Sequence, residues 1–145
     1  MAELWTVKSA HSCISLEYVK EQDWFYLKWS GHINSDEVVA VAQTYLELQQ
    51  EKRCPKLLND KSEVTGEWEE ANYWLQFEWM PQVEQTGLQY LALVLSHDMH
   101  DQTSSQELQR RLSSVCSVAL FCDLAAATQW LSGPKPTDIR QTLTC

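Results

Sequence analysis

Residues 55 to 84 decide the fold of this chain, and they read P-K-L-L-N-D-K-S-E-V-T-G-E-W-E-E-A-N-Y-W-L-Q-F-E-W-M-P-Q-V-E. The stretch predicts a short buried strand at 56–59, a polar turn from Asp60, and an aromatic-rich helix over 66–84. At about 100° per residue this helix carries two apolar stripes on nearly opposite sides. The first stripe is Trp68, Ala71, Leu75 and Trp79, and the second is Tyr73, Phe77 and Met80 with Trp74 beside it. One stripe can face a sheet, whereas the other needs a different cover.

On either side of this stretch the pattern alternates between strands and helices. Ile14, Leu16 and Tyr18 alternate with polar residues and predict a half-buried strand, and the strand formers of 24–29 predict its antiparallel partner. Asn34 with Glu37 predicts the start of a helix that runs to about Gln50. The later predicted elements are a buried strand over 88–95, a short helix capped by Ser104, a strand over 115–121 and a helix capped by Asp123.

The predicted element order is β-β-α-β-α-β-α-β-α, with Pro81 ending or kinking the second helix. After the first hairpin, strict alternation requires right-handed crossovers and parallel strands covered by helices. We therefore predict an α/β fold with a mixed, mostly parallel five-stranded sheet and four helices. The 145 residues are expected to form one domain, with a core over about 12–132 and a loosely held tail over 133–145.

Composition and charge narrow the possible partners. Hydrophobic residues make up 44% of the chain and charged residues 21%, which is typical of globular proteins. The formal charge of −9 argues against nucleic acid and against an anionic membrane surface, because both require basic protein surfaces. No run reaches the roughly 18 apolar residues of a membrane span. Five cysteines without a C-x-x-C pair indicate neither a disulfide framework nor a zinc ribbon, so we expect a cytoplasmic protein.

The element order, with a first hairpin, a short third strand ending in Asn59-Asp60 and a loop into the second helix, resembles the STAS-like family of anti-sigma-factor antagonists. The resemblance covers most of residues 12–132 and is one of order more than of motif. In that family an Asp-Ser-Ser/Thr-Gly loop carries a hydroxyl whose phosphorylation switches a partner. The nearest matches here are Ser62 and Thr65, and Lys61 or Val64 stands where the family has Asp. Ser62 and Thr65 are therefore candidate phospho-acceptors, with capping and turning of the chain as the alternative.

Two histidines follow a predicted parallel strand in the run His97-Asp98-Met99-His100-Asp101. Imidazole and carboxylate groups suit a zinc ion, so His97 and His100 are the candidate metal ligands. Because H-x-x-H in a loop fixes no geometry, a solvated turn that caps the next helix is the alternative. We expect no bound metal, no cofactor and no catalytic residue, since no acid, base and nucleophile can be placed together.

The second stripe of helix 66–84 is the most informative feature for function. If Tyr73, Trp74, Phe77 and Met80 are exposed, they form an apolar patch of the kind that marks an interface or a ligand groove. Cover by the tail, by the segment around Trp5 or by a neighbouring helix is the alternative. We predict a non-enzymatic signalling domain that binds a protein partner through this helix and the preceding loop, with a homodimer as the leading form. The alternative is a small apolar ligand or lipid bound between helix and sheet, as in the related CRAL-TRIO-type domains.

Overall fold

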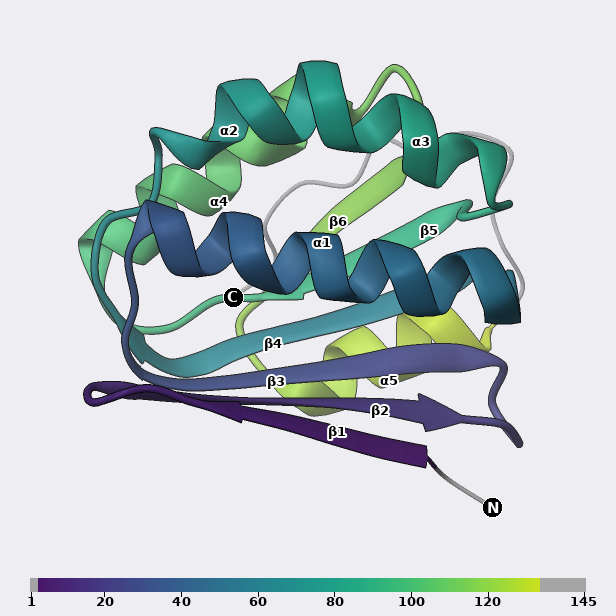
Figure 1. Cartoon of the computed structure of the whole chain (residues 1–145), viewed down its shortest axis with the longest axis horizontal. Coiled ribbons are helices and arrows are strands. Elements are labelled where there is room, and N and C mark those ends of the chain that lie inside the picture. Colours follow the sequence, from purple (N-terminus) through teal and green to yellow (C-terminus); the bar gives the residue numbers. More distant parts are fainter. Residues whose placement is uncertain (1–2, 134–145) are drawn as a thin grey trace.

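A single six-stranded sheet organises the computed structural model, which describes residues 3–133 (Figure 1). Its strands are β1 (Glu3–Lys8), β2 (Ser12–Val19), β3 (Trp24–His32), β4 (Lys56–Thr65), β5 (Tyr90–Val94) and β6 (Ser117–Phe121). Four helical elements pack on it: α1 (Ser35–Lys52), the continuous segment α2 (Ala71–Trp74), η1 (Leu75–Trp79) and α3 (Met80–Gln85), then α4 (Met99–Leu112) and α5 (Leu124–Ser132). The predicted α/β class is confirmed. The predicted tail lies outside the described residues apart from its first position.

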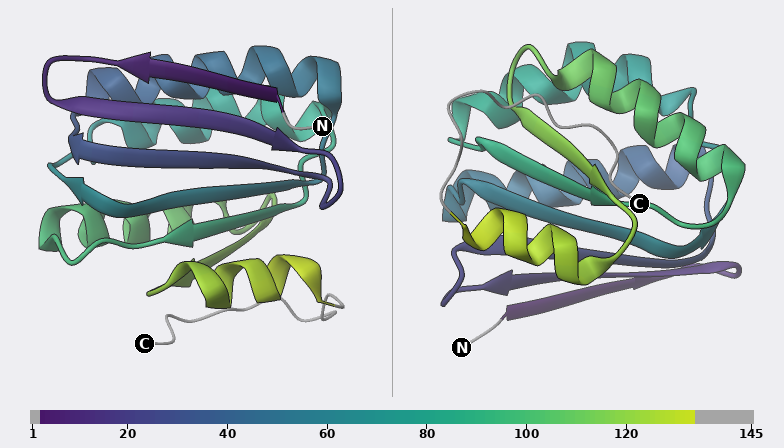
Figure 2. Two further views of the ribbon diagram at one scale, coloured as in Figure 1. Left: turned by 90° about the horizontal axis from the view of Figure 1, so that it is seen from below. Right: turned by 180° about the vertical axis from the view of Figure 1, so that it is seen from behind.

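The strands lie in the order in which they occur along the chain, from β1 to β6. The pairs β1–β2 and β2–β3 are antiparallel, and every later pair is parallel, as predicted from the alternation after the hairpin. Each right-handed crossover moves one strand in the same direction, so α1, the 71–85 segment and α4 cover the same face. Helix α5 follows the last strand and packs on the opposite face (Figure 2).

The two faces of the sheet carry cores of unequal size. The larger core lies under α1, the 71–85 segment and α4, and it includes Phe25, Trp29, Tyr45, Trp68 and Trp79. The smaller core lies under α5 and contains Trp24, Leu58, Ala92, Val94, Ala119, Phe121, Ala127 and Leu131. Alternating residues of β4, β5 and β6 supply both cores because successive side chains of a strand point to opposite faces. The three-helix face is therefore where most of the apolar surface is buried.

The prediction of five strands is wrong, because the N-terminal segment forms β1 at the edge of the sheet. It pairs along β2, with Trp5 opposite Leu16. Leu4 and Val7 remain exposed and Trp5 is half buried, so the segment lacks the alternating burial that reveals a strand. An edge strand buries little of its own surface, and its pairing depends on a neighbour that local sequence does not show.

The predicted turn at Asp60 is also wrong, because β4 continues as a strand through Thr65. Strand β3 is long enough to pair with the extension, and His32 lies opposite Thr65. A β-bulge between Lys28 and Ser30 adds one residue to β4 in this region. Strand β5 ends opposite Asp60, so the last five residues of β4 have β3 as their only neighbour in the sheet. Polar residues in this part of the sequence therefore belong to the sheet.

The starts of α1 and α5 agree with the predictions, because the predicted capping side chains are the ones that cap these helices. Asn34 accepts a hydrogen bond from Glu37 N at the start of α1, and Asp123 accepts one from Ala126 N at the start of α5. Helix α4 is the exception. It begins at Met99 behind Asp98, and Ser104, predicted as its cap, is buried in its middle. Across the described part of the chain, no helix combines the length and the apolar character needed to span a membrane.

Candidate functional site

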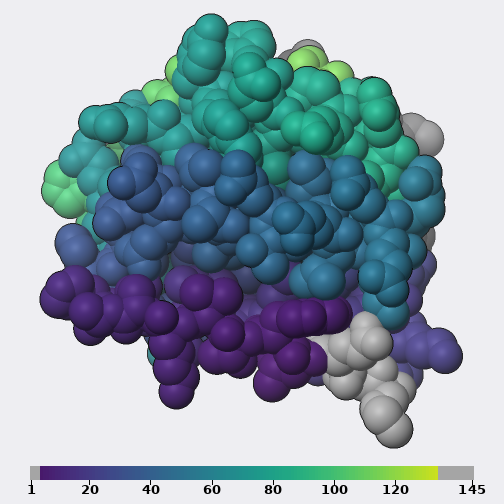
Figure 3. All heavy atoms as spheres, in the orientation of Figure 1, coloured from purple at the N-terminus to yellow at the C-terminus, as the bar shows by residue number. Residues whose placement is uncertain are grey.

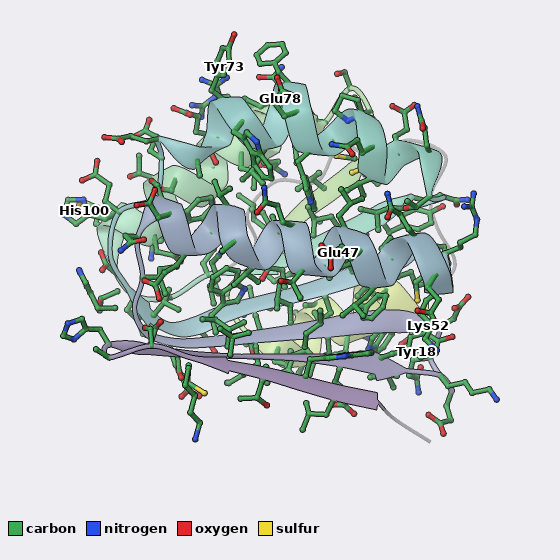
Figure 4. All side chains as sticks on the ribbon, in the orientation of Figure 1. Tyr18, Glu47, Lys52, Tyr73, Glu78 and His100 are labelled. Atoms are coloured by element: carbon green, nitrogen blue, oxygen red, sulfur yellow. The ribbon has the colours of Figure 1, made fainter. Side chains whose placement is uncertain are left out.

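Two aromatic side chains project from the outer side of the 71–85 segment. Tyr73 is 66% exposed and Phe77 52% exposed, and their ring centroids lie 4.7 Å apart at 48°. Tyr73 points away from the sheet (Figure 4). Trp74, the third member of the predicted patch, is half buried against the larger core. The exposed apolar surface of the segment is thus a tilted aromatic pair together with the exposed part of Trp74.

The prediction that Met80 belongs to this patch is wrong, because Met80 is 1% exposed and lies in the larger core. The reason is the π-helical turn η1, in which the Met80 N–H donates to the Leu75 carbonyl five residues earlier. A π turn contains one residue more than an α turn and rotates everything after it. Helical structure continues through Pro81 to Gln85, so Pro81 coincides with a change of turn type and does not end the helix.

The segment that carries the aromatic pair is itself acidic, and a cation that contacts it from α4 is Arg111, whose Nη1 donates to Gln76 Oε1 at 2.8 Å. Residues 67–85 contain five glutamates and neither lysine nor arginine. Glu78 projects beside Tyr73 on the outer side (Figure 4). A shallow hollow between the start of α1 and the turn before α2 is lined by Asn34, Ser35, Asp36, Glu67, Glu69 and Glu70. A hydrogen bond with Glu107, together with its charge, raises the pKa of Glu69, as expected where carboxyl groups crowd together. Helix α1 and the 71–85 segment lie side by side on this face (Figure 3).

The two candidate phospho-acceptors lie on strand β4 and not in a loop. Ser62 is half buried, and its backbone N–H donates to Asp60 Oδ1 at 3.0 Å. Thr65 is exposed at the end of the strand, with its Oγ1 3.0 Å from His32 Nδ1. Phosphorylation of either residue stays a prediction, and Thr65 is the more accessible hydroxyl.

The histidine loop is built around Asp98 and Asp101. Asp98 Oδ1 accepts a hydrogen bond from His100 N at 2.8 Å, which caps α4. Both His97 and His100 are exposed, and His100 points away from the fold (Figure 4). Within residues 3–133, no group of three or more His, Cys, Asp or Glu side chains is placed to hold a metal ion. Asp98 thus makes this loop a capping turn for α4.

Lys61 lies between two tryptophan rings on the three-helix side of β4. Its Nζ is 4.1 Å from the ring centroid of Trp29 and 4.2 Å from that of Trp68. Trp29 belongs to β3, and Trp68 to the irregular segment 66–70 that precedes α2. Lys61 is only 2% exposed. The negative faces of the two rings attract the ammonium group and replace part of its lost hydration.

Both tryptophans are held by hydrogen bonds from their indole N–H groups. Trp29 Nε1 donates to Asn59 Oδ1 at 2.6 Å, and Trp68 Nε1 donates to Asp101 Oδ1 at 3.0 Å. The second oxygen of Asp101 accepts hydrogen bonds from the backbone N–H and the hydroxyl of Ser96. The two rings are therefore fixed on either side of the ammonium group by β4 and by the start of α4.

A cavity of about 40 Å³ adjoins this lysine between the sheet and the helices. Its polar lining consists of Tyr45, Asn59 and Lys61. Its apolar lining consists of Leu27, Trp29, Val38, Ala42, Leu57, Trp68, Leu75, Trp79, Leu91 and Leu108. Burial lowers the pKa of Lys61 to about 8, and the charge of Asp101 partly offsets this effect. Lys61 is therefore mostly protonated at neutral pH, in a site that is apolar on nearly every side.

The opposite face of β4 carries a second polar group, centred on Asp60. Its Oδ2 accepts a hydrogen bond from Tyr26 OH at 2.8 Å and lies 3.4 Å from Lys28 Nζ. Burial raises the pKa of the Asp60 carboxyl, but hydrogen bonds from Ser62 and Tyr26 and the charge of Lys28 outweigh it, so the pKa lies below its ordinary value. Asp60 and Lys61, which were expected to begin a turn, are thus both part of strand β4. Asp60 lies on one face of the sheet, and Lys61 lies on the three-helix face.

The sequence prediction missed Asn59 and Lys61 as cavity residues, although the pattern contained a signal for them. Leu57, Asn59 and Lys61 alternate along the chain, and residues two apart in a strand share a face. Leu57 is an expected core residue. Had the strand been extended past Asp60, the same alternation would have placed Asn59 and Lys61 under the helices. Two polar side chains on the buried face of a strand would then have indicated a site, because buried polar groups normally need partners.

Comparisons with known proteins return no assignment. No protein-family model matches this chain, and neither a curated protein nor a solved structure matches it with significant similarity.

Proposed function

We propose that this chain is a non-enzymatic, STAS-like interaction domain that binds a protein partner through the outer surface of the 71–85 segment. One observation carries the proposal: Tyr73 and Phe77 contact each other as a tilted ring pair while more than half of each residue is exposed. Aromatic side chains are enriched where proteins bind one another, because each adds a large contact area at a low cost in conformational entropy. The half-buried Trp74 extends the same surface toward the core.

Charge identifies the kind of partner. The aromatic pair is flanked by Glu70 and Glu78, both exposed, in a stretch that contains no basic residue. A second copy of the chain would bring another net charge of −9 and would repel this surface. A partner segment that presents apolar side chains among lysines and arginines fits both properties. The proposed partner is therefore a basic segment of a different protein.

A selection from a random-peptide phage library tests this proposal. Peptides selected on the purified protein are expected to be basic and to contain aromatic or large aliphatic residues. A synthetic peptide from the selection should bind the Tyr73→Ser/Phe77→Ser double variant about tenfold more weakly, because the central apolar contacts are lost. Met99→Ser, which removes another exposed apolar side chain at 76% exposure, is the matched control and should leave the affinity unchanged.

Three outcomes contradict the proposal. The first is a selection that returns acidic or neutral peptides, and the second is binding that survives loss of both rings. In the third, sedimentation velocity detects a dimer that the double variant abolishes, which would identify the occupant of the surface as a second copy of the chain. The Glu70→Gln/Glu78→Gln variant adds an independent measure, since removing rim charges should slow association and weaken its salt dependence.

A second candidate function is binding of a small molecule between the helices and the sheet. The observation that favours it is the cavity beside Lys61, which combines apolar walls with a small number of polar groups, as ligand sites do. Native mass spectrometry of the purified protein tests it by detecting a bound small molecule. This function uses the inner side of the same helical segment and is compatible with partner binding on the outer side.

A further inference from the structure

Three polar side chains border the internal cavity, and Lys61, Asn59 and Tyr45 each carry a donor that has no acceptor in the described part of the chain. Within the described residues, the Nζ of Lys61 donates no hydrogen bond, and its contacts are with the faces of Trp29 and Trp68. Both Lys61 and Asn59 are more than nine-tenths buried, at 2% and 8% exposure. A buried ammonium group normally has a charged partner or hydrogen-bond acceptors, because losing water is costly. The aromatic faces supply attraction but accept none of its three N–H groups in the ordinary way.

The orientation of Asn59 adds a second donor on the same side of β4. Its Oδ1 accepts the indole N–H of Trp29 at 2.6 Å, and an indole N–H requires an acceptor, so the amide cannot be turned the other way. The Nδ2 group of Asn59 is thereby left for another acceptor, and it donates to no side chain or carbonyl in the described part of the chain, although Asn59 lines the cavity. Asn59 and Lys61 are two residues apart on one strand and therefore share a face.

The charge balance of the site is positive at the cavity wall. Asp101 is the carboxylate whose charge acts on Lys61, but its oxygens are engaged by Trp68 and Ser96. No hydrogen bond joins Asp101 to Lys61, and the indole of Trp68 contacts both groups. A ligand that enters the cavity thus meets one ammonium group, one amide donor, the unpartnered hydroxyl of Tyr45 and hydrocarbon.

We propose that Lys61 and Asn59 bind the carboxylate of a small monocarboxylic acid whose short apolar tail occupies the remainder of this cavity. This inference rests on the second candidate function and names its ligand class. A carboxylate supplies acceptors for both donors and an opposite charge for the ammonium group. The aliphatic side chains of Leu75 and Leu108, on the helical side, suit a hydrocarbon tail.

The volume limits the ligand to a short chain. A space of about 40 Å³ holds a few water-sized groups, since one water needs roughly 10–15 Å³ by the same measure. Acids of the size of acetate to butyrate match this space, and a long-chain fatty acid does not. Trp68 lies in an irregular segment, so the wall that it forms can open without breaking a helix or a strand.

The experiment is a titration of the ¹⁵N-labelled protein with sodium propionate, followed through the indole N–H signals of its tryptophans. Propionate should shift the Trp29 and Trp68 signals saturably, with a Kd on the order of 1 mM for so small a ligand. Propionamide, which has nearly the same shape and no charge, should bind at least about tenfold more weakly. Assignment of the two signals comes from Trp29→Phe and Trp68→Phe.

Variants then locate the contact. Lys61→Met should abolish the propionate shifts, whereas Lys52→Met, which removes a lysine that packs on Tyr18 at the surface, should leave them unchanged. The comparison of propionate with propionamide on the wild-type protein tests the proposal even if Lys61→Met fails to fold.

If propionamide binds as tightly as propionate, or if Lys61→Met retains binding, the carboxylate site is disproved while a neutral ligand stays compatible with the second candidate function. If neither compound shifts any indole signal, the inference is overturned. Native mass spectrometry then decides the second candidate function separately, and the proposed protein-binding surface is unaffected.

Discussion

The carboxylate of Asp98 accepts a hydrogen bond from the backbone N–H of Gly66 at 2.8 Å. Its other oxygen caps α4 through His100 N, so one side chain joins the loop after β4 to the start of the helix after β5. Trp68, two residues beyond Gly66, makes a second connection to α4 through Asp101. These two contacts hold the segment that closes the lysine cavity.

We expect Asp98→Ala to lower the free energy of unfolding by about 1–2 kcal/mol, because a helix cap and a loop contact are both lost. Asp98→Asn is the control, since asparagine also caps helices well.

Burial raises the pKa of Asp98, but hydrogen bonds from Gly66 and His100 outweigh it and place the pKa below its ordinary value. The unfolded chain therefore binds the proton first, and the stabilising contribution of Asp98 is lost as the pH falls below about 4. Urea unfolding of both variants and the wild type over this range measures the effect, and an unchanged pH dependence in Asp98→Asn would contradict it.

Gly66 itself provides a second prediction. Its φ is +119°, and a Cβ there would lie 2.1 Å from the carbonyl oxygen of Ile33. Gly66→Ala should destabilise the protein by more than about 2 kcal/mol, because steric overlap adds to the strain of a left-handed backbone. Gly87→Ala separates the two causes: Gly87 has φ +100° but no atom within 4 Å of the added carbon, and about 1 kcal/mol is expected. Equal losses in thermal or urea unfolding would show that the contact with Ile33 is unimportant.

The buried lysine should give the protein an unusual dependence on alkaline pH. The pKa of Lys61 is about 8 in the folded protein and 10.5 in the unfolded chain, so between these values the unfolded state holds the extra proton. The contribution of Lys61 to folding stability should therefore rise with pH over this range, by about 3 kcal/mol in the limit, and be constant below pH 8. The raised pKa values of buried groups such as Cys54 and Cys116 act in the opposite sense, and they do so in both the wild type and a Lys61 variant. Lys61→Met should lack this contribution, so that its stability relative to the wild type falls between pH 8 and pH 10.5, and it should be at least as stable as the wild type at pH 7. Unfolding free energies of the two proteins at pH 7 and near pH 10 test this, and parallel pH profiles would exclude it.

The π turn allows a prediction by deletion. Glu78 is exposed and lies within η1, and removing it should turn the five-residue turn into an ordinary α turn while Met80 keeps its position in the core. We expect the deletion variant to fold with helical content close to that of the wild type and a stability change within about 1 kcal/mol. Insertion of an alanine after Glu78 is the opposite control, since it should rotate Trp79 and Met80 out of the core. Circular dichroism and urea unfolding distinguish the two, and a deletion variant as unstable as the insertion would count against the assignment.

The parts of the fold that sequence predicted are those where a local pattern and the tertiary environment agree. Ile14 and Leu16 alternate because one face of β2 meets the core, and Asn34 and Asp123 cap helices through bonds within their own first turn. Such signals need no distant partner. The same holds for the parallel arrangement after the hairpin, which follows from element order.

The parts that sequence did not predict depend on distant contacts. Strand β1 exists because β2 accepts it, and β4 extends past Asp60 because β3 pairs with it as far as His32. Met80 was assigned to the wrong side because a constant 100° per residue does not allow for a π turn. The polar character of Lys61 favours a turn in the sequence. Its burial is explained only by the indoles of Trp29 and Trp68, which lie 32 and 7 positions away in the chain.

The consecutive strand order also bears on how the molecule is made. Every strand hydrogen-bonds to the one synthesised immediately before it, so each new strand leaving the ribosome finds its template already in place. No strand must wait for a later segment to be inserted between existing neighbours, and chain closure stays short at each addition. Assembly can thus proceed from the N-terminus as translation advances, and α5 is the last described element to cover the growing sheet.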